Sequence, residues 1–288
     1  MNMSKRKRKS RVGLDLGAGS ARGFAHIGVL QVLKENDIPI DFIVGSSMGA
    51  MVGAVYASGG DIYMTGKMAA ALNHSLFWDV GVPRMGLIRG KRIEKLLCMI
   101  TKEKNFDELE LPLAVVATDI KTGERVVIRE GPVYKAVRAS ISIPGVFEPV
   151  RLDDHLLVDG AVGDRLPLSV AWDMGANLVL GVDVTFADDK ETQIDNMLDV
   201  IFQAVELLEK QIFENLVRSQ ASVLIQPRLG NLSSRDFSRA EECIAIGREC
   251  ALAKMDEIRK ALDECEKSVK KKPGKPSKKV VKESTASS

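Results

Sequence analysis

The sequence predicts an α/β protein, with a mostly parallel sheet sandwiched by helices in three α/β/α layers. Short apolar runs alternate with longer segments whose apolar residues recur every three or four positions, as strands alternating with helices do. Such an alternation places helices over a parallel sheet. Residues are 45% hydrophobic but only 5% aromatic, so aliphatic side chains must build the core.

The first part of the chain alternates strand and helix twice. The predicted ranges are a strand at 11–16, a helix at 24–37, a strand at 40–44 and a helix at 48–58. The first strand ends at Gly17, and Pro39 stops the first helix because proline cannot continue it. In the second helix Gly49, Gly53 and Ala57 recur every four residues, which forms a smooth ridge for close packing.

The rest of the body continues the alternation without an internal repeat, so residues 11–266 are predicted to form one domain. Helical pieces fill a variable segment at 61–108, whose apolar, methionine-containing composition predicts a lid or lipid-contact surface, or ordinary core. Then follow strands at 111–120 and 124–130, a helix at 133–142, a hairpin at 150–160, a helix at 167–175, a strand at 177–186, an amphipathic helix at 198–216, a strand at 222–227 and a helix at 237–262.

Charge is distributed unevenly along the chain. Residues 1–11 hold six Lys/Arg and no acid, and residues 267–288 hold eight Lys and one Glu. With these ends set aside, 27 of 41 basic and 38 of 39 acidic residues remain, a charge near −11. We predict disordered basic tails at 1–10 and 267–288. They either solubilise the protein or dock on anionic lipid or nucleic acid, at about 1 kcal/mol per basic residue near a membrane; no specific nucleic acid is predicted.

Composition argues against a metalloprotein and a membrane-spanning protein. The cysteines are Cys98, Cys243, Cys250 and Cys265, and the histidines are His26, His74 and His155. Neither set has the spacing of a zinc site, so we expect reduced thiols, no metal and no cofactor. We recognise no signal peptide, and the uncharged run at 42–60 contains five glycines and three serines, a weak membrane span. A cytoplasmic protein is expected, with peripheral membrane association as an option.

The motif Gly45-x-Ser47-x-Gly49 lies between the strand predicted at 40–44 and the helix predicted at 48–58. This is the setting of a nucleophile elbow, where a tight turn strains the backbone of the central serine. The serine hydroxyl then lies at a helix N-terminus, whose dipole favours a developing anion. The pattern alone is common in other proteins, but its setting makes Ser47 the candidate nucleophile.

A serine nucleophile needs a base, and two kinds are available. In the order Ser…Asp/Glu…His the histidine comes late, but His155 is the last one here and would need an earlier acid such as Asp119. The alternative is Asp159, which ends an apolar run before Gly160-Ala161. Burial beside a serine raises a carboxyl pKa towards that of a general base, although a strand-end Asp-Gly is more often only a turn.

The loop at 16–28 is rich in small residues and lies between the first strand and helix. Its exposed N–H groups at a helix N-terminus suit a phosphate or an oxyanion. It lacks the third glycine of a dinucleotide fingerprint and the G-K-S/T of a Walker loop. Arg22 adds charge there or locks the loop through hydrogen bonds.

Together these features resemble the patatin-like phospholipase family, whose hallmarks are a glycine-rich oxyanion loop, G-x-S-x-G and D-G-A/G, in that order. Here they correspond to Ala18-Gly19-Ser20-Ala21-Arg22-Gly23, to Gly45 through Gly49, and to Asp159-Gly160-Ala161. The stretches "ARGFAHIGVL", "GSSMGAMVGAVYASG" and "RASISIPGVFEPV" are similar to bacterial members related to the neuropathy target esterase catalytic domain. The likeness covers about residues 11–230.

The resemblance implies a Ser-Asp dyad without histidine. Ser47 would be the nucleophile, Asp159 the base, and the N–H groups of the 18–22 loop would bind the oxyanion. The expected reaction is hydrolysis of an acyl ester in phospholipid or lysophospholipid through an acyl-serine intermediate.

The sequence departs from the family pattern at Ala18 and Ser20, which replace loop glycines. If either position requires a positive φ, its side chain costs about 1–2 kcal/mol, and losing one oxyanion donor costs about 10²–10³ in rate. The alternative is therefore a patatin-fold regulatory protein with low turnover that binds lipid or a partner. A weaker alternative is a phosphate-ligand enzyme that uses the 17–23 loop.

Overall fold

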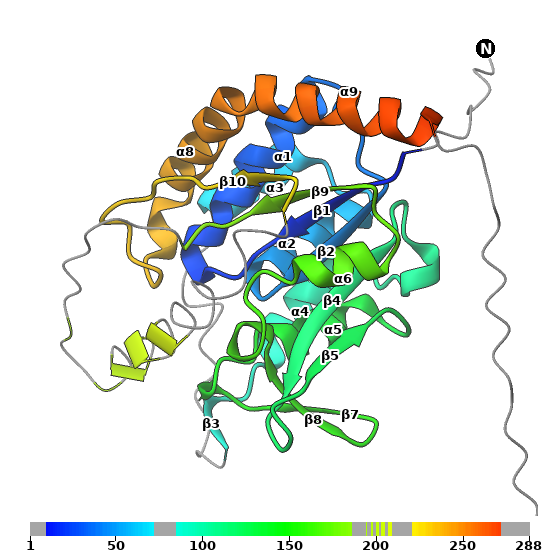
Figure 1. The fold of residues 1–288 in the computed structure, drawn as a ribbon. Coiled ribbons are helices and arrows are strands. Elements are labelled where there is room, and N and C mark those ends of the chain that lie inside the picture. The colour runs from blue at the N-terminus through cyan, green and yellow to red at the C-terminus, as the bar shows by residue number, and fades with distance from the viewer. Residues whose placement is uncertain are drawn as a thin grey trace, which may run out of the picture.

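The computed structural model describes residues 10–71, 85–185 and 221–271, together with residues 194, 197, 200, 201, 203, 204, 207 and 208. Its centre is an eight-stranded sheet of order β10-β9-β1-β2-β4-β8-β7, with β5 paired to β4 as well (Figure 1). Its strands are β1 (Val12–Leu16), β2 (Phe42–Ser46), β4 (Leu113–Asp119), β5 (Arg125–Ile128), β7 (Val150–Leu152), β8 (His155–Asp159), β9 (Leu178–Val182) and β10 (Val223–Ile225). A two-stranded sheet pairs β3 (Gly86–Ile88) with β6 (Gly145–Phe147).

The central strands are parallel, as predicted. β10, β9, β1, β2 and β4 pair in parallel, whereas β5, β8 and β7 add antiparallel pairs at one side. Every residue of β1, β2, β4 and β9 is buried. Continuous apolar strands of this kind are expected where helices cover both faces of a parallel sheet.

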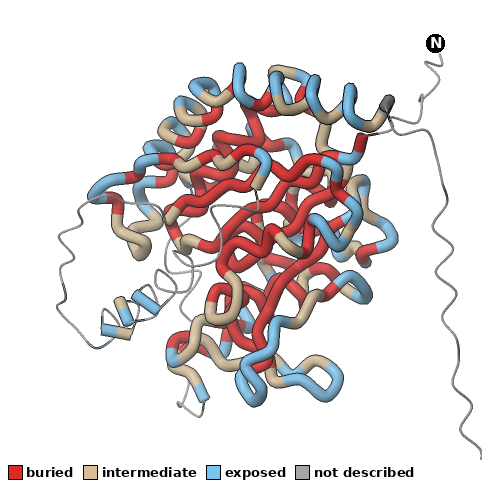
Figure 2. Tube along the Cα trace, in the orientation of Figure 1, coloured by how far each residue is buried: buried red, intermediate tan, exposed pale blue. Residues whose placement is uncertain are grey.

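Helices cover the two faces unequally. The described helices are α1 (Ala25–Glu35), α2 (Met48–Ala57), α3 (Ile62–Ala71), α4 (Lys91–Ile100), α5 (Val133–Ser140), α6 (Leu168–Asp173), α8 (Ala240–Ala253) and α9 (Met255–Lys271). The larger core joins one face to α1, α2, α5, α8 and α9, and the smaller core joins the other face to α6. Ile43 points into the first core, whereas Phe42 and Val44 point into the second. Figure 2 shows the buried residues concentrated along the sheet between these layers.

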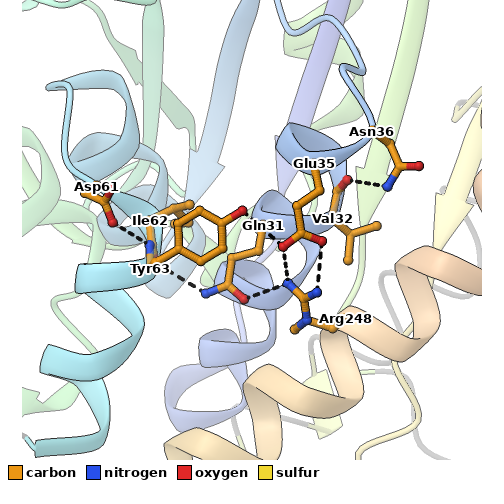
Figure 3. A network of polar contacts seen from close by, with 8 residues as sticks. All are labelled: Gln31, Val32, Glu35, Asn36, Asp61, Ile62, Tyr63 and Arg248. Carbon is orange, nitrogen blue, oxygen red and sulfur yellow. Dashed lines mark hydrogen bonds and ion pairs between the residues drawn. The ribbon is translucent and has the colours of Figure 1, made fainter.

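A polar network ties α1, α3 and α8 together on the outside of the larger layer (Figure 3). Arg248 of α8 donates to both carboxylate oxygens of Glu35 at 2.9 Å and to Gln31 Oε1 at 3.1 Å. Tyr63 Oη of α3 donates to Glu35 Oε1 at 3.0 Å. The bidentate contact fixes the orientation of the helices more than it adds stability, because the Arg248 and Glu35 side chains are each about one-third exposed.

The C-terminal helix differs from the prediction. Instead of one helix at 237–262, α8 ends at Ala253 and α9 continues to Lys271, so the predicted tail boundary at 267 falls inside a helix. α8 lies so close against α1 that a Cβ on Gly28 would collide with the Ile244 carbonyl oxygen. The chain must then change direction after α8 for α9 to cover β9 and β10.

Some predicted segments lie outside the described residues. These are 1–9 and 272–288 of the predicted tails, 72–84 of the predicted lid, and most of the predicted helix at 198–216. The described positions inside that helix, 200, 201, 203, 204, 207 and 208, are helical. Within the part of the chain that the structure describes, no helix has both the length and the apolar character needed to cross a bilayer.

Candidate active site

Strands β2 and β8 meet end to end along one edge of β4. β2 runs parallel to β4 up to Ser46, opposite Val116, and β8 runs antiparallel to β4 up to Asp159, opposite Ala117. β5 pairs with an overlapping part of β4, so it occupies the other edge and leaves this one to β2 and β8. The residue that follows β2 and the residue that ends β8 thereby become neighbours.

Ser47 is the residue that follows β2, and α2 begins at the next position. Its backbone has φ 53° and ψ −122°, a conformation that costs about 1–3 kcal/mol outside glycine. Its carbonyl accepts the first helical hydrogen bond, from Met51 N–H at 3.1 Å. Ser47 Oγ donates to Asp159 Oδ2 at 2.6 Å. The structure thus brings the predicted nucleophile and the predicted base into direct contact.

Asp159 is held by three hydrogen bonds. Besides the bond from Ser47, its Oδ1 accepts from Ala161 N–H at 2.9 Å, and its own N–H donates to Ser142 O at 2.9 Å. Burial raises the pKa of the Asp159 carboxyl to about 7, while the bonds from Ser47 and Ala161 act in the opposite direction. A carboxyl with this pKa exchanges protons readily near neutral pH, which is what a general base requires.

Glycines allow backbone segments to pack closely around Ser47 and Asp159. A Cβ on Gly49 would collide with the Leu16 carbonyl oxygen, and one on Gly160 with the Val116 carbonyl oxygen. A Cβ on Gly45 would lie 2.6 Å from the Cα of Ala50. The glycines of G-x-S-x-G and D-G-A are therefore required by close approach and not by positive φ.

The loop at 18–23 lies so close to the start of α2 that a Cβ on Gly23 would collide with the Met48 side chain. The N–H groups of Ala18, Ala21 and Arg22 donate to backbone carbonyls at 2.8–3.0 Å. For the N–H groups of Gly19 and Ser20 there is no acceptor among the described residues. Two of the predicted donors therefore have no described acceptor, and three are already used.

The two departures from the glycine-rich pattern differ in backbone conformation. Ser20 has φ 49°, so it carries the strain of about 1–2 kcal/mol expected for a side chain in the left-handed region. Ala18 does not have a positive φ. At Gly19 space is the constraint, because a Cβ there would collide with the Val184 side chain.

Two buried side chains, those of Arg22 and His26, hydrogen-bond to backbone carbonyls at this loop. Arg22 Nε donates to Leu232 O at 2.7 Å, which fits the second of the two roles considered for Arg22, a lock formed by hydrogen bonds. His26 Nε2 lies 2.7 Å from Gly17 O. Burial lowers the pKa of His26 to about 4, so the ring is neutral and its Nε2 must carry the proton that it donates to this carbonyl.

The structure does not assemble the alternative histidine triad. His155 Nδ1 does lie 2.7 Å from Asp119 Oδ2. However, His155 is four residues before Asp159 on the extended strand β8, about 13 Å away at 3.3 Å per residue. His74 lies outside the described residues. Nor do the described residues contain a cluster of His, Cys, Asp or Glu that could hold a metal ion.

Sequence reasoning missed Ser140 at the end of α5. Its hydroxyl accepts a hydrogen bond from Ser47 N–H at 2.8 Å and donates to Val116 O at 2.6 Å. Ser140 lies within the quoted stretch "RASISIPGVFEPV", but a serine at a helix end is too common to signal such a contact. The one available signal was spacing: Ser140 shares a helical face with the apolar residues Val133, Ala136 and Val137, where a polar side chain is unusual.

Comparison with known proteins gives a consistent result. Residues 14–172 match the family model described as patatin-like phospholipase. An NTE family protein of Mycobacterium tuberculosis is 38% identical over 176 residues, which cover 60% of this chain and 49% of that protein. Patatin-like phospholipase domain-containing protein 6 of Homo sapiens is 32% identical over 188 residues, which cover 62% of this chain and 14% of that protein. The chain thus spans about half or less of these relatives.

A solved structure shares the fold. The crystal structure of VipD from Legionella pneumophila superposes with a TM-score of 0.60 at 16% sequence identity, covering 89% of this chain and 67% of that chain.

Proposed function

The chain belongs to the patatin-like phospholipase family, and from this premise we propose that it is a serine acyl hydrolase acting on phospholipid or lysophospholipid. The observation that carries the proposal is the 2.6 Å hydrogen bond from Ser47 Oγ to Asp159 Oδ2 at the ends of β2 and β8. Family membership supports lipid hydrolysis. The Ser-Asp dyad and the phospholipid or lysophospholipid substrate are what we propose in addition.

In the acylation step Ser47 Oγ attacks the ester carbonyl carbon while Asp159 Oδ2 takes its proton. The carbonyl oxygen becomes negative and accepts hydrogen bonds from the N–H groups of Gly19 and Ser20. When the tetrahedral intermediate collapses, the bond to the leaving alcohol breaks and Asp159 returns the proton to that alcohol. An acyl-serine remains, and the displaced product is a lysophospholipid or a glycerophospho-alcohol.

Deacylation repeats these steps with water. The water oxygen attacks the acyl carbon while Asp159 takes a proton from the water. Asp159 then protonates Ser47 Oγ as the fatty acid leaves. The same oxyanion donors act in both halves of the reaction. No histidine is needed, because the buried carboxyl has a pKa of about 7 and bonds to the nucleophile directly.

Membrane contact belongs to the same proposal but rests on the sequence. The basic ends at 1–10 and 267–288 carry 13 positive charges that favour an anionic lipid surface. Cytoplasmic localisation likewise stays a prediction.

Fatty-acid release tests the proposed reaction. Phosphatidylcholine and lysophosphatidylcholine are offered in mixed micelles to wild type, Ser47→Ala, Asp159→Asn and Ser46→Ala. We expect Ser47→Ala and Asp159→Asn to lose at least about 10³-fold in rate. Ser46→Ala is the matched control, because the Ser46 hydroxyl is buried beside the elbow but bonds to no described group. Hydrolysis that survives both substitutions would falsify the proposal.

A second candidate is a patatin-fold protein that binds lipid or a partner with little turnover. The observation that favours it is the closed dyad, in which Ser47 is 5% and Asp159 3% exposed. This candidate predicts that phospholipid vesicles bind wild type and Ser47→Ala equally while neither releases fatty acid. Turnover that depends on Ser47 would exclude it.

A further inference from the structure

Ser140 connects the nucleophile elbow to the central sheet. Its side chain is fully buried at the C-terminal end of α5. The hydroxyl oxygen accepts from Ser47 N–H at 2.8 Å, and its hydrogen goes to Val116 O at 2.6 Å. Val116 lies opposite Ser46 on β4, so this bridge spans the position at which β2 stops pairing.

The N–H group of Ser47 depends on this bridge. β2 ends at the preceding residue, and an N–H at the start of a helix has no partner inside that helix. Among the described residues, the Ser140 hydroxyl is the acceptor of this N–H group. The strained backbone of Ser47 persists only where neighbouring groups fix it, and this hydrogen bond is one of the contacts that do so.

The same short segment also holds the base. Two residues after Ser140, the Ser142 carbonyl accepts from Asp159 N–H at 2.9 Å. Arg138 Nη1 donates to Ser142 Oγ at 2.6 Å, and Arg138 Nη2 donates to Glu148 O at 3.1 Å. The end of α5 therefore contacts one backbone N–H group on each half of the dyad.

We propose that Ser140 is a positioning residue, whose hydroxyl holds the Ser47 backbone so that Ser47 Oγ stays aligned with Asp159. The inference rests on the proposed function and adds a residue to it. Ser140 acts through Ser47 and does not touch the substrate. Without the hydroxyl, Ser47 N–H loses its buried acceptor, the elbow relaxes, and the hydrogen bond between Ser47 and Asp159 lengthens.

Two readouts separate positioning from general structural support. The first is the second-order rate of phosphonylation by a fluorophosphonate probe, with kcat and KM for a short-chain p-nitrophenyl ester. The second is hydrogen exchange of the Ser47 amide, measured by ¹⁵N NMR. Variants are Ser140→Ala, Ser140→Cys and the matched control Ser58→Ala, which removes an equally buried serine hydroxyl just after α2 that bonds to no described group.

We expect Ser140→Ala to lower the labelling rate and kcat by about 10²-fold, as a misplacement of about 1 Å does, with KM unchanged. Its Ser47 amide should exchange at least about tenfold faster. Ser140→Cys keeps the side-chain size and a weak acceptor, so an intermediate rate is expected, and this variant decides the matter if Ser140→Ala does not fold. Ser58→Ala should keep the wild-type labelling rate and Ser47 exchange.

Three results would overturn the inference: wild-type labelling in folded Ser140→Ala and Ser140→Cys, unchanged Ser47 exchange in them, or an equal loss in Ser58→Ala. If wild type itself is neither labelled nor active, the proposed function fails, and the amide exchange alone decides whether Ser140 positions Ser47.

Discussion

Ser47 Oγ donates a 2.6 Å hydrogen bond to Asp159 Oδ2 across 112 residues of sequence. The contact follows from the sheet, because β2 approaches it from one direction along β4 and β8 from the other. Both groups are buried, so their hydrogen bond lies in a low-dielectric environment, where it is stronger than in water.

The pH dependence of hydrolysis should follow Asp159. Because the base must be ionised and burial raises its pKa to about 7, kcat/KM should increase with pH and level off above an apparent pKa of about 7. A pH–rate profile from pH 5 to 9 measures this value. His155, which contacts Asp119, is the alternative base, so His155→Asn is the control, and it should leave the profile unchanged. A profile that is flat in wild type or lost in His155→Asn would contradict the assignment.

Asp15 should make the protein less stable as pH rises. It is fully buried on β1, and neither carboxylate oxygen has a hydrogen-bond partner among the described residues. Burial, and secondarily the charge of Asp164, raises the pKa of Asp15 well above its ordinary value, while Arg125 lowers it. The folded state therefore binds more protons than the unfolded state above about pH 4, and its stability falls as pH rises towards the folded-state pKa.

Urea unfolding of Asp15→Asn at pH 5 and pH 8 tests this expectation. The variant should gain about 1–3 kcal/mol relative to wild type on going from pH 5 to pH 8. Asp183→Asn is the contrasting control, because Asp183 is equally buried but accepts from Arg165 and Gln226, so this variant should be destabilised. Equal pH dependence in wild type and Asp15→Asn would refute the role of Asp15.

Ser20→Gly should relieve strain without loss of activity. Ser20 has φ 49°, where a side chain costs about 1–2 kcal/mol, but glycine in the unfolded chain offsets part of this gain. We expect a stability increase of less than about 1 kcal/mol by thermal unfolding, with kcat within about threefold of wild type, because the Ser20 N–H group remains. Asp153→Gly, at φ 50° in the β7–β8 turn, is the matched control. A tenfold fall in kcat in Ser20→Gly alone would instead assign a role to the hydroxyl.

Two glycines on α2 should differ in their tolerance of alanine. A Cβ on Gly49 would collide with the Leu16 carbonyl oxygen, which belongs to the backbone of β1 and cannot move aside. We expect Gly49→Ala to lose at least about 2 kcal/mol of stability and most of its activity. A Cβ on Gly53 would lie 2.9 Å from the Ile43 Cγ2 methyl, which is a side-chain atom and not backbone, and alanine favours the helix. Denaturant unfolding should therefore leave Gly53→Ala within about 1 kcal/mol of wild type; similar losses in both would disprove this explanation.

Local sequence patterns predicted the elements around Ser47 and Asp159 because each depends on neighbours in the chain. The strand before Ser47, the helix after it and the hairpin that ends at Asp159 all follow from periodicity and from turn residues. The small β3–β6 sheet was missed because its three-residue strands leave no periodic pattern.

Contacts between distant segments could not be predicted in the same way. The small-residue loop identified residues 18–22 as N–H donors, but hydrogen bonds to Arg165 and Ser234 in distant segments, and one within the loop, leave only Gly19 and Ser20 without a described acceptor. Ser140 contacts Ser47 because α5 packs against β4, a relationship that depends on the tertiary arrangement. The break after Ala253 depends likewise on two different packing partners for α8 and α9.

The most direct test of the dyad is the site and rate of fluorophosphonate labelling, measured by intact and peptide mass spectrometry on wild type, Ser46→Ala, Ser47→Ala and Asp159→Asn. We expect a single adduct on Ser47 in wild type and in Ser46→Ala, none in Ser47→Ala, and labelling slowed by at least about 10³-fold in Asp159→Asn. A folded wild type that is not labelled, or an adduct that persists in Ser47→Ala, would contradict this expectation.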